Sequence, residues 1–312
     1  MEILKNKGYL KIPVLFFCLL LVLISCQSYK EQKKKLFDTP DRGRINVSAD
    51  ESFKPIVDEL VQVYEANHPG TEINVQYKPE AECLKDMIVD SIRLVIATRG
   101  FSESEKNFIV DSFRLSPRKM VVARDAVAVI VSPQAEDSLF TMTELKEVLT
   151  GKFKKDLIPV FDGVQATSTV RYIVDSVLQN AALAPGAVAA RTSEGVIDYV
   201  AKNPKAVGFI GVSWIANPED PQQISFLEKV KIVQLESKDL KGRYILPVQA
   251  NIYLRRYPMV RDLVYILKEN HRGLGKGLAD FMSGEIGQLI FKRAYLMPAQ
   301  KDFRVRPIRV TE

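Results

Sequence analysis

The sequence is poor in the residues that metal sites and disulfide scaffolds need, with three Cys and two His among 312 residues. So few ligands exclude a disulfide-rich fold and a zinc ribbon. His68 stands in an Asn-His-Pro-Gly turn and His271 in a polar segment, and neither has the spacing of a metal ligand. We therefore expect neither a bound metal nor a cofactor.

Motifs of common enzymes are also missing. The sequence contains no P-loop, no dinucleotide-binding glycine fingerprint and no G-x-S-x-G elbow. Residues 273–277 are rich in glycine, but they do not follow a buried strand, so they predict a turn and a helix start. A Ser-His-Asp triad is not excluded by the sequence. Hydrolases and transferases are nevertheless the least favoured class, and we predict that the protein is not an enzyme.

The sequence has a small excess of basic residues over acidic ones. The formal charge is +6 and the pI is near 9.0, with 16 Gly, 16 Pro and 26% charged residues, which is an ordinary globular composition. Removal of the N-terminal leader described below would lower this charge to +4. The rest of the chain has no Arg/Lys stripe interleaved with aromatic residues, so nucleic acid is not an expected partner.

The first 25 residues read as a secretion signal. Three Lys precede an apolar run at 12–24, which at about 13 residues is too short to span a membrane but suits a signal peptide. The run ends in Leu-Ile-Ser-Cys at 23–26, which resembles a bacterial lipobox and implies cleavage before Cys26 and acylation of its thiol. The alternative is an ordinary signal peptide with an accidental Cys. We expect a lipoprotein of the cell envelope that faces the periplasm.

The other two cysteines are then not expected to form a disulfide in the mature protein. Cys18 is discarded with the leader, and Cys83 is expected to be a small buried residue without a disulfide partner. Residues 26–43 are polar and carry four Lys, which predicts a flexible tether beside the membrane. The Lys cluster would contact anionic lipid headgroups, and the alternative is that it is only solvated.

From Arg44 onward, strand-like and helix-like segments alternate, which predicts an α/β fold with mostly parallel sheets. The expected strands are 45–49, 71–77, 92–97, 126–132, 157–161, 206–210, 231–235 and 244–254. The expected helices are 52–67, one after Ser102, one after Thr141, 168–179, one after Ser193, 258–269, 274–282 and 285–295.

Ligands of such folds bind where strands end and helices begin. Three of these junctions, at 48–53, 97–100 and 162–171, carry hydroxyls or an Arg. Free N–H groups, hydroxyl donors and a planar guanidinium are suited to a tetrahedral oxyanion. The alternative at each junction is simple helix capping. The candidate ligand-binding residues are Asp50, Ser52, Phe53, Thr98, Arg99, Thr167, Ser168, Thr169 and Arg171.

The order and spacing of several segments resemble those of the periplasmic phosphate-binding proteins of ABC importers, which have the type II solute-binding fold. The resemblance runs from about Arg44 to Arg309. It is carried by the segments 45–55, 67–70, 95–101, 123–131, 145–151, 166–171, 206–211, 283–288 and 296–298.

This resemblance implies two α/β lobes that close on one anion, with lobe 1 at 44–131 and 248–312 and lobe 2 at 132–247. It implies that Ser52 and Phe53 donate from the first helix start. The second lobe would donate from the Thr167–Thr169 segment, and Thr98 and Arg99 would lie in a loop between them.

Two positions depart from the family pattern. Thr98 stands where the family has a carboxylate that accepts a proton from hydrogen phosphate, and Gly163 stands where it has an Arg. Arg99 or Arg171 would replace that positive charge. Asp50, Glu51 and Glu80 are the candidates for the carboxylate role. The segment 80–83, Glu-Ala-Glu-Cys, replaces a Ser/Gly-rich loop and adds negative charge.

We predict a monomeric, lipid-anchored protein that captures phosphate or a related oxyanion by lobe closure and delivers it to ABC permease subunits. The alternative is a sensor or interaction lipoprotein on the same fold that binds another ligand or a protein partner.

Overall fold

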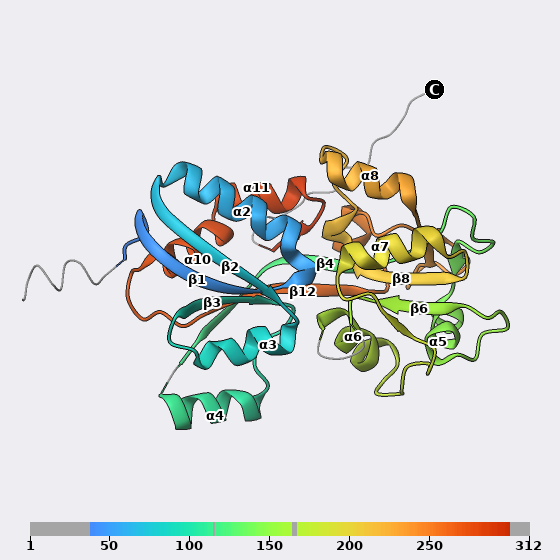
Figure 1. Ribbon diagram of the computed structural model, residues 1–312, viewed down its shortest axis with the longest axis horizontal. Coiled ribbons are helices and arrows are strands. Elements are labelled where there is room, and N and C mark those ends of the chain that lie inside the picture. Colours follow the sequence, from blue (N-terminus) through green and yellow to red (C-terminus); the bar gives the residue numbers. More distant parts are fainter. Residues whose placement is uncertain (1–37, 115, 164–166, 300–312) are drawn as a thin grey trace, which may run out of the picture.

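A long curled sheet runs through the molecule and carries helices on both faces (Figure 1). The computed structural model describes residues 38–114, 116–163 and 167–299. The predicted leader, Cys26 and most of the predicted tether lie outside these ranges. Within them, every helix is too short or too polar to cross a lipid bilayer.

The main sheet has the strand order β2-β1-β3-β12-β4-β8-β6-β7, and β9 and β13 also pair with β4. A small second sheet has the order β11-β10-β5. The strands are β1 (Arg42–Asp50), β2 (Gly70–Lys78), β3 (Ile92–Ala97), β4 (Arg118–Val131), β5 (Leu139–Phe140), β6 (Ile158–Phe161), β7 (Val188–Ala189), β8 (Ala206–Gly211), β9 (Lys231–Ile232), β10 (Gln234–Glu236), β11 (Tyr244–Ile245), β12 (Val260–Leu267) and β13 (Met297–Pro298).

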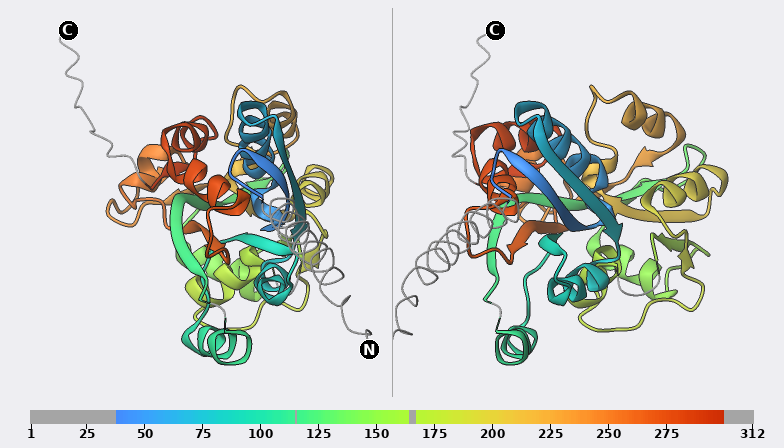
Figure 2. Two further views of the ribbon diagram at one scale, coloured as in Figure 1. Left: turned by 90° about the vertical axis from the view of Figure 1, so that its left-hand side faces the viewer. Right: turned by 60° about the vertical axis from the view of Figure 1, so that its left-hand side comes forward.

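Helices cover both faces of the sheet (Figure 1). The longer α-helices are α2 (Lys54–Asn67), α4 (Glu103–Phe113), α5 (Met142–Thr150), α7 (Ser193–Lys202), α8 (Pro221–Lys229), α10 (Leu274–Ser283) and α11 (Glu285–Arg293). The shorter ones are α3 (Glu80–Lys85), α6 (Ser168–Tyr172) and α9 (Gln249–Tyr253), with a 3-10 turn at Glu51–Phe53 before α2 and a π-helical turn at Ile173–Val177 after α6. The capping boxes predicted before α4 and α5 are present. Figure 2 shows that α4 stands away from the sheet, and Ile109 is its single buried residue.

The two halves of the sheet share β4. Its first part pairs with β12 through Ala126, and its last five residues, from Val127, pair with β8. We call the side with β1, β2 and β3 the first half and the side with β6, β7 and β8 the second half. Residues 126–131 are buried on both faces, as the continuous apolar run predicts.

Three predicted elements differ from the structure. Residues 231–235 form parts of two short strands, β9 in the main sheet and β10 in the small one, rather than one strand. Residues 258–269 form strand β12 rather than a helix, because the β-branched run fits a slot between β3 and β4 where both neighbours supply backbone partners. Residues 244–254 form a two-residue strand and then α9 rather than one strand. The sheet is also less parallel than expected, since β12 is antiparallel to β3 and β4, and β4 is antiparallel to β8.

Candidate oxyanion-binding site

Two helix starts, one from each half of the sheet, meet in the interior. Ser52 lies in the turn after β1 and Ser168 is the first residue of α6, and their Oγ atoms are 3.1 Å apart. Asp50 Oδ1 accepts hydrogen bonds from the backbone N–H and the hydroxyl of Ser52, while the Thr167 side chain caps α6. Both serines are fully buried. The sequence-predicted junctions at 48–53 and 162–171 are therefore in contact through these two serines.

A buried arginine lies beside these serines. The guanidinium of Arg261 donates from Nε to Asp125 Oδ2 at 2.8 Å and from Nη1 to Ser168 Oγ at 3.0 Å. Nη1 also lies 3.4 Å from Thr169 Oγ1, and the guanidinium carbon is 5.2 Å from the centre of the Phe53 ring. Arg261 is 5% exposed. The site therefore has a fixed positive charge in contact with two predicted donors.

The sequence analysis missed Arg261 because the segment around it was read as a helix. The feature that could have revealed it is the Arg-Asp pair at 261–262 inside the run Val-Arg-Asp-Leu-Val-Tyr-Ile-Leu. In a central strand, one residue of such a pair points to each face. Arg261 turns inward and is buried, whereas Asp262 is exposed.

Gly211 leaves little room for a side chain next to this arginine. A Cβ on Gly211, at the end of β8, would lie 3.0 Å from Arg261 Nη2 and 3.0 Å from the Ser52 carbonyl oxygen. The neighbouring Ser213 donates from its hydroxyl to that same carbonyl oxygen at 3.0 Å. The end of β8 thus packs tightly against the first helix start.

The carboxyl groups of the site hold their protons more strongly than free aspartates. Burial raises the pKa of Asp50 and of Asp125, and burial with the nearby Asp50 and Glu51 charges raises the pKa of Asp162 to about 7. Within the described chain, Asp50 Oδ2 and Asp162 Oδ1 are buried without a hydrogen-bond partner. These carboxyls can exchange a proton with a hydroxyl group of a ligand.

Glu80 forms a second contact between the halves. Its Oε1 accepts a 2.8 Å hydrogen bond from the Thr98 N–H and also one from the Thr98 hydroxyl. Its Oε2 accepts from Arg171 Nε at 2.6 Å, and Arg171 Nη2 donates to Thr98 Oγ1 at 2.6 Å. A carboxylate of the protein thus occupies donors that the sequence analysis assigned to the ligand.

The other carboxylate candidate and Arg99 have partners of their own. Glu51 accepts from the N–H and the hydroxyl of Ser193 at the start of α7. Arg99 donates to both carboxylate oxygens of Glu105. The structure therefore ties Arg99 to α4, although its side chain still lines the cleft described next.

A cleft of about 340 Å³ opens beside the buried serines. Thr98 and Arg99 after β3, Arg171 on α6 and Arg261 on β12 contribute to its walls. The buried cluster and the cleft share Arg261. Two of the predicted junctions, at 97–100 and 162–171, thus contribute residues to the cleft, whereas the junction at 48–53 reaches it only through the contact of Ser52 with Ser168.

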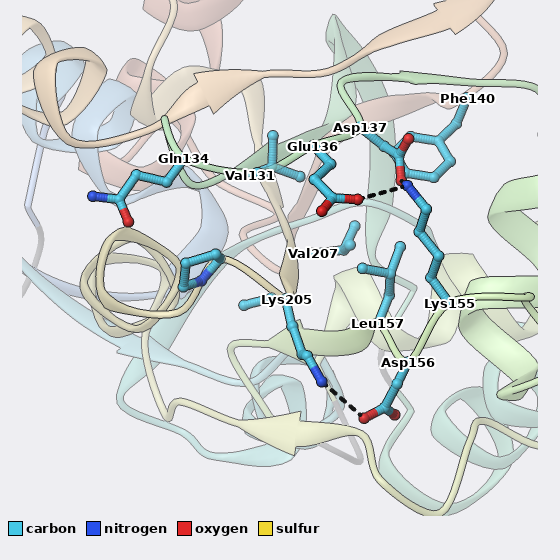
Figure 3. A pocket seen from close by; sticks show the side chains of 13 residues that line it. Val131, Gln134, Glu136, Asp137, Phe140, Lys155, Asp156, Leu157, Lys205 and Val207 are labelled. Carbon is cyan, nitrogen blue, oxygen red and sulfur yellow. Dashed lines mark hydrogen bonds and ion pairs between the residues drawn. The ribbon is translucent and has the colours of Figure 1, made fainter.

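A second cavity, of about 400 Å³, is not part of this site (Figure 3). It lies where β6 and β8 begin, which is the opposite end of these strands from the helix starts. Its lining mixes apolar and charged side chains, and its two lysines, Lys155 and Lys205, are paired with carboxylates. None of the sequence-predicted ligand residues lines it.

Asp38, Glu269 and His271 bring three possible metal ligands within 4.8 Å of one another. However, both carboxylates accept hydrogen bonds from the first N–H groups of α10, and both pair with Arg93. This cluster caps a helix. Cys83 is fully buried and free, as predicted.

Comparisons with known proteins give a family and a fold. A family model described as "PBP superfamily domain" matches residues 38–285. No curated protein matches the chain. A putative phosphate ABC transporter substrate-binding protein with bound phosphate from Clostridium perfringens is 18% identical, with a TM-score of 0.67. The match covers 82% of this chain and 100% of that one.

Two further solved structures share the fold. An ABC-type phosphate transport receptor from Vibrio cholerae is 19% identical, covers 81% of this chain and 99% of its own, and has a TM-score of 0.61. The regulatory domain of CcmR from Synechocystis PCC6803, in complex with 2-PG, is 10% identical, covers 78% and 96%, and has a TM-score of 0.53. The expected type II solute-binding fold is confirmed.

Proposed function

Since this chain belongs to the PBP superfamily, whose members bind solutes rather than act as enzymes, we propose that it captures phosphate or a related oxyanion for an ABC importer. One observation carries the proposal. The helix starts of the two halves meet at Ser52 and Ser168, and the Arg261 guanidinium donates to Ser168. Backbone N–H groups, hydroxyls and one buried cation suit a tetrahedral oxyanion.

The proposed mechanism is closure of two lobes. Lobe 1 comprises 44–131 and 248–312, and lobe 2 comprises 132–247. Bonds between them at Ser52–Ser168, Glu51–Ser193 and Glu80–Arg171 form only when the halves are in contact. A ligand that adds bonds to both helix starts would favour this closed state.

The proposed setting is the cell envelope, with the 1–25 leader removed, Cys26 acylated and the 26–43 tether carrying a monomer to its permease. The proposed ligand residues are Asp50, Ser52, Phe53, Thr98, Thr167, Ser168 and Thr169, with Arg261 as the cation and Arg99 and Arg171 at the mouth. Mass analysis of the mature N-terminus tests the acylation, and it would be overturned by an unmodified Cys26.

Titration calorimetry with phosphate, arsenate and sulfate tests the function. We expect phosphate and arsenate to bind, and sulfate to bind more weakly because it carries no proton to share with Asp50. Absence of binding by all three anions would overturn the proposal. An Arg99→Ala variant should weaken phosphate binding only about twofold, since Arg99 lies at the mouth and shares its charge with Glu105. Affinity equal to that of the parent would remove Arg99 from the site.

One observation favours the second candidate, a sensor or interaction lipoprotein without transport. Glu80 accepts from the Thr98 N–H and from Arg171, so the halves have a contact of their own. Such a protein would close without an anion. Small-angle X-ray scattering with and without phosphate distinguishes the two candidates, because a transport protein contracts on binding.

A further inference from the structure

The cleft beside the proposed phosphate position has more positive charge than one tetrahedral anion needs. Asp262 is the single carboxylate among its lining residues. Six cationic side chains line the same 340 Å³ space, namely Arg99, Arg124, Arg171, Lys238, Arg255 and Arg261. They come from both halves of the sheet and from the crossing strands β4 and β12.

Three of these cations are already neutralised. Arg99 pairs with Glu105, Arg171 with Glu80, and Arg261 with Asp125. Of the three, Arg261 also contacts the buried Ser168. Their charges are therefore shared between the protein and any bound anion.

The other three cations are not neutralised to the same extent. Across the described ranges 38–114, 116–163 and 167–299, no carboxylate lies within ion-pair distance of Lys238 or Arg255. Arg124 reaches only a long 3.8 Å contact with the half-exposed Asp262, and its buried Nε has no hydrogen-bond partner among the described residues. A buried N–H without an acceptor costs free energy that a ligand oxygen would recover.

The two groups of cations are connected through Arg261, because its guanidinium donates to Ser168 and its side chain also lines the cleft. An anion seated at Ser168 therefore leaves the rest of its molecule in the cleft. We propose that the ligand is a phosphorylated solute with a second anionic group, such as an oligophosphate or an acidic phosphate monoester. Arg124, Lys238 and Arg255 bind that second group. This inference rests on the proposed function of the same site.

Calorimetry with three probes tests it: inorganic phosphate, methyl phosphate and pyrophosphate. Each partly exposed ion pair changes affinity about twofold, so three pairs make pyrophosphate bind about tenfold more tightly than phosphate. Methyl phosphate, which adds bulk without the second charge, should bind no more tightly than phosphate.

The variant R124Q/K238Q/R255Q removes the unneutralised cations, and K205Q/K229Q/R293Q removes three exposed cations that do not line the cleft. The first variant should lose the tenfold preference for pyrophosphate and keep its affinity for phosphate within about threefold. The second should keep the preference.

The outcomes separate the two proposals. Phosphate binding by the parent without any preference for pyrophosphate overturns the second anionic subsite and leaves the proposed function standing. A preference that survives in R124Q/K238Q/R255Q also overturns the subsite. Failure of the parent to bind any of the three probes overturns both.

Discussion

Ser52 and Ser168 are separated by 116 positions in the sequence, yet their hydroxyl oxygens lie 3.1 Å apart in a fully buried contact between the two halves of the sheet. Each hydroxyl has a second partner as well, Asp50 for Ser52 and, across from its own half, Arg261 of β12 for Ser168. The contact is therefore the point at which a ligand would touch both halves at once. The predictions below concern this point and its surroundings.

A Ser168→Ala substitution should weaken phosphate binding about tenfold, because a hydrogen bond to a charged group contributes about 1.5–3 kcal/mol. The measurement is titration calorimetry. Ser225→Ala, on the exposed face of α8, is the matched control and should bind as the parent does. Equal affinities for both variants would remove Ser168 from the site.

Arg261→Gln should destabilise the protein by about 3–5 kcal/mol, because Asp125 would be left as an uncompensated buried charge. Urea unfolding measures this loss. The double variant Asp125→Asn/Arg261→Gln should recover part of the stability. Arg293→Gln removes an exposed ion pair with Glu219 and should cost at most about 1 kcal/mol. If Arg261→Gln lost no more stability than this control, the buried pair of Arg261 and Asp125 would not be a stabilising contact.

Glu80→Gln should bind phosphate about tenfold more tightly than the parent, a change of about 1.4 kcal/mol. The amide keeps the shape of Glu80 but removes the negative charge that competes with a ligand for Arg171 and Thr98. Glu82→Gln, two residues away and exposed, serves as the control. Unchanged or weaker binding by Glu80→Gln would show that its carboxylate does not compete.

Asp162 should make the protein less stable as the pH rises. Its pKa is raised to about 7 in the folded state from an ordinary value of 3.8, so the folded state holds the proton more tightly. Its contribution is fully present below about pH 4 and is lost as the pH rises through 7. A shift of this size corresponds to about 4 kcal/mol at most.

The measurement is the free energy of unfolding from pH 4 to pH 8 for the parent and for Asp162→Asn. The variant should show a flatter profile and should be more stable than the parent at pH 8. Parallel profiles would mean that Asp162 has an ordinary pKa.

The sequence allowed much of the fold to be predicted, because its signals are local. The run at 92–97 is apolar apart from Arg93, and it forms β3 over those same residues. The capping boxes at Ser102 and Thr141 mark the starts of α4 and α5. Such patterns depend on neighbours within a few positions, so they can be read without the rest of the chain.

The site could be predicted only in part. The helix starts at Ser52 and Ser168 carry local signals, but the pairing of Arg261 with Asp125 spans 136 positions and depends on the register of β12 against β4. Glu80 and Arg171 are 91 positions apart, and they too meet only in the folded chain. Residues that the fold brings together over such distances have no characteristic spacing in the sequence.

The burial of Cys83 gives the protein a practical property. Burial raises the pKa of this thiol to about 12, so almost none of it is thiolate at neutral pH, and thiol reagents have no access to it. With Cys18 cleaved and Cys26 acylated, as proposed, the mature protein would have no reactive thiol in its background. A pair of dyes on two introduced cysteines, one on α4 and one on α8, would then report opening and closing of the halves by energy transfer in single molecules.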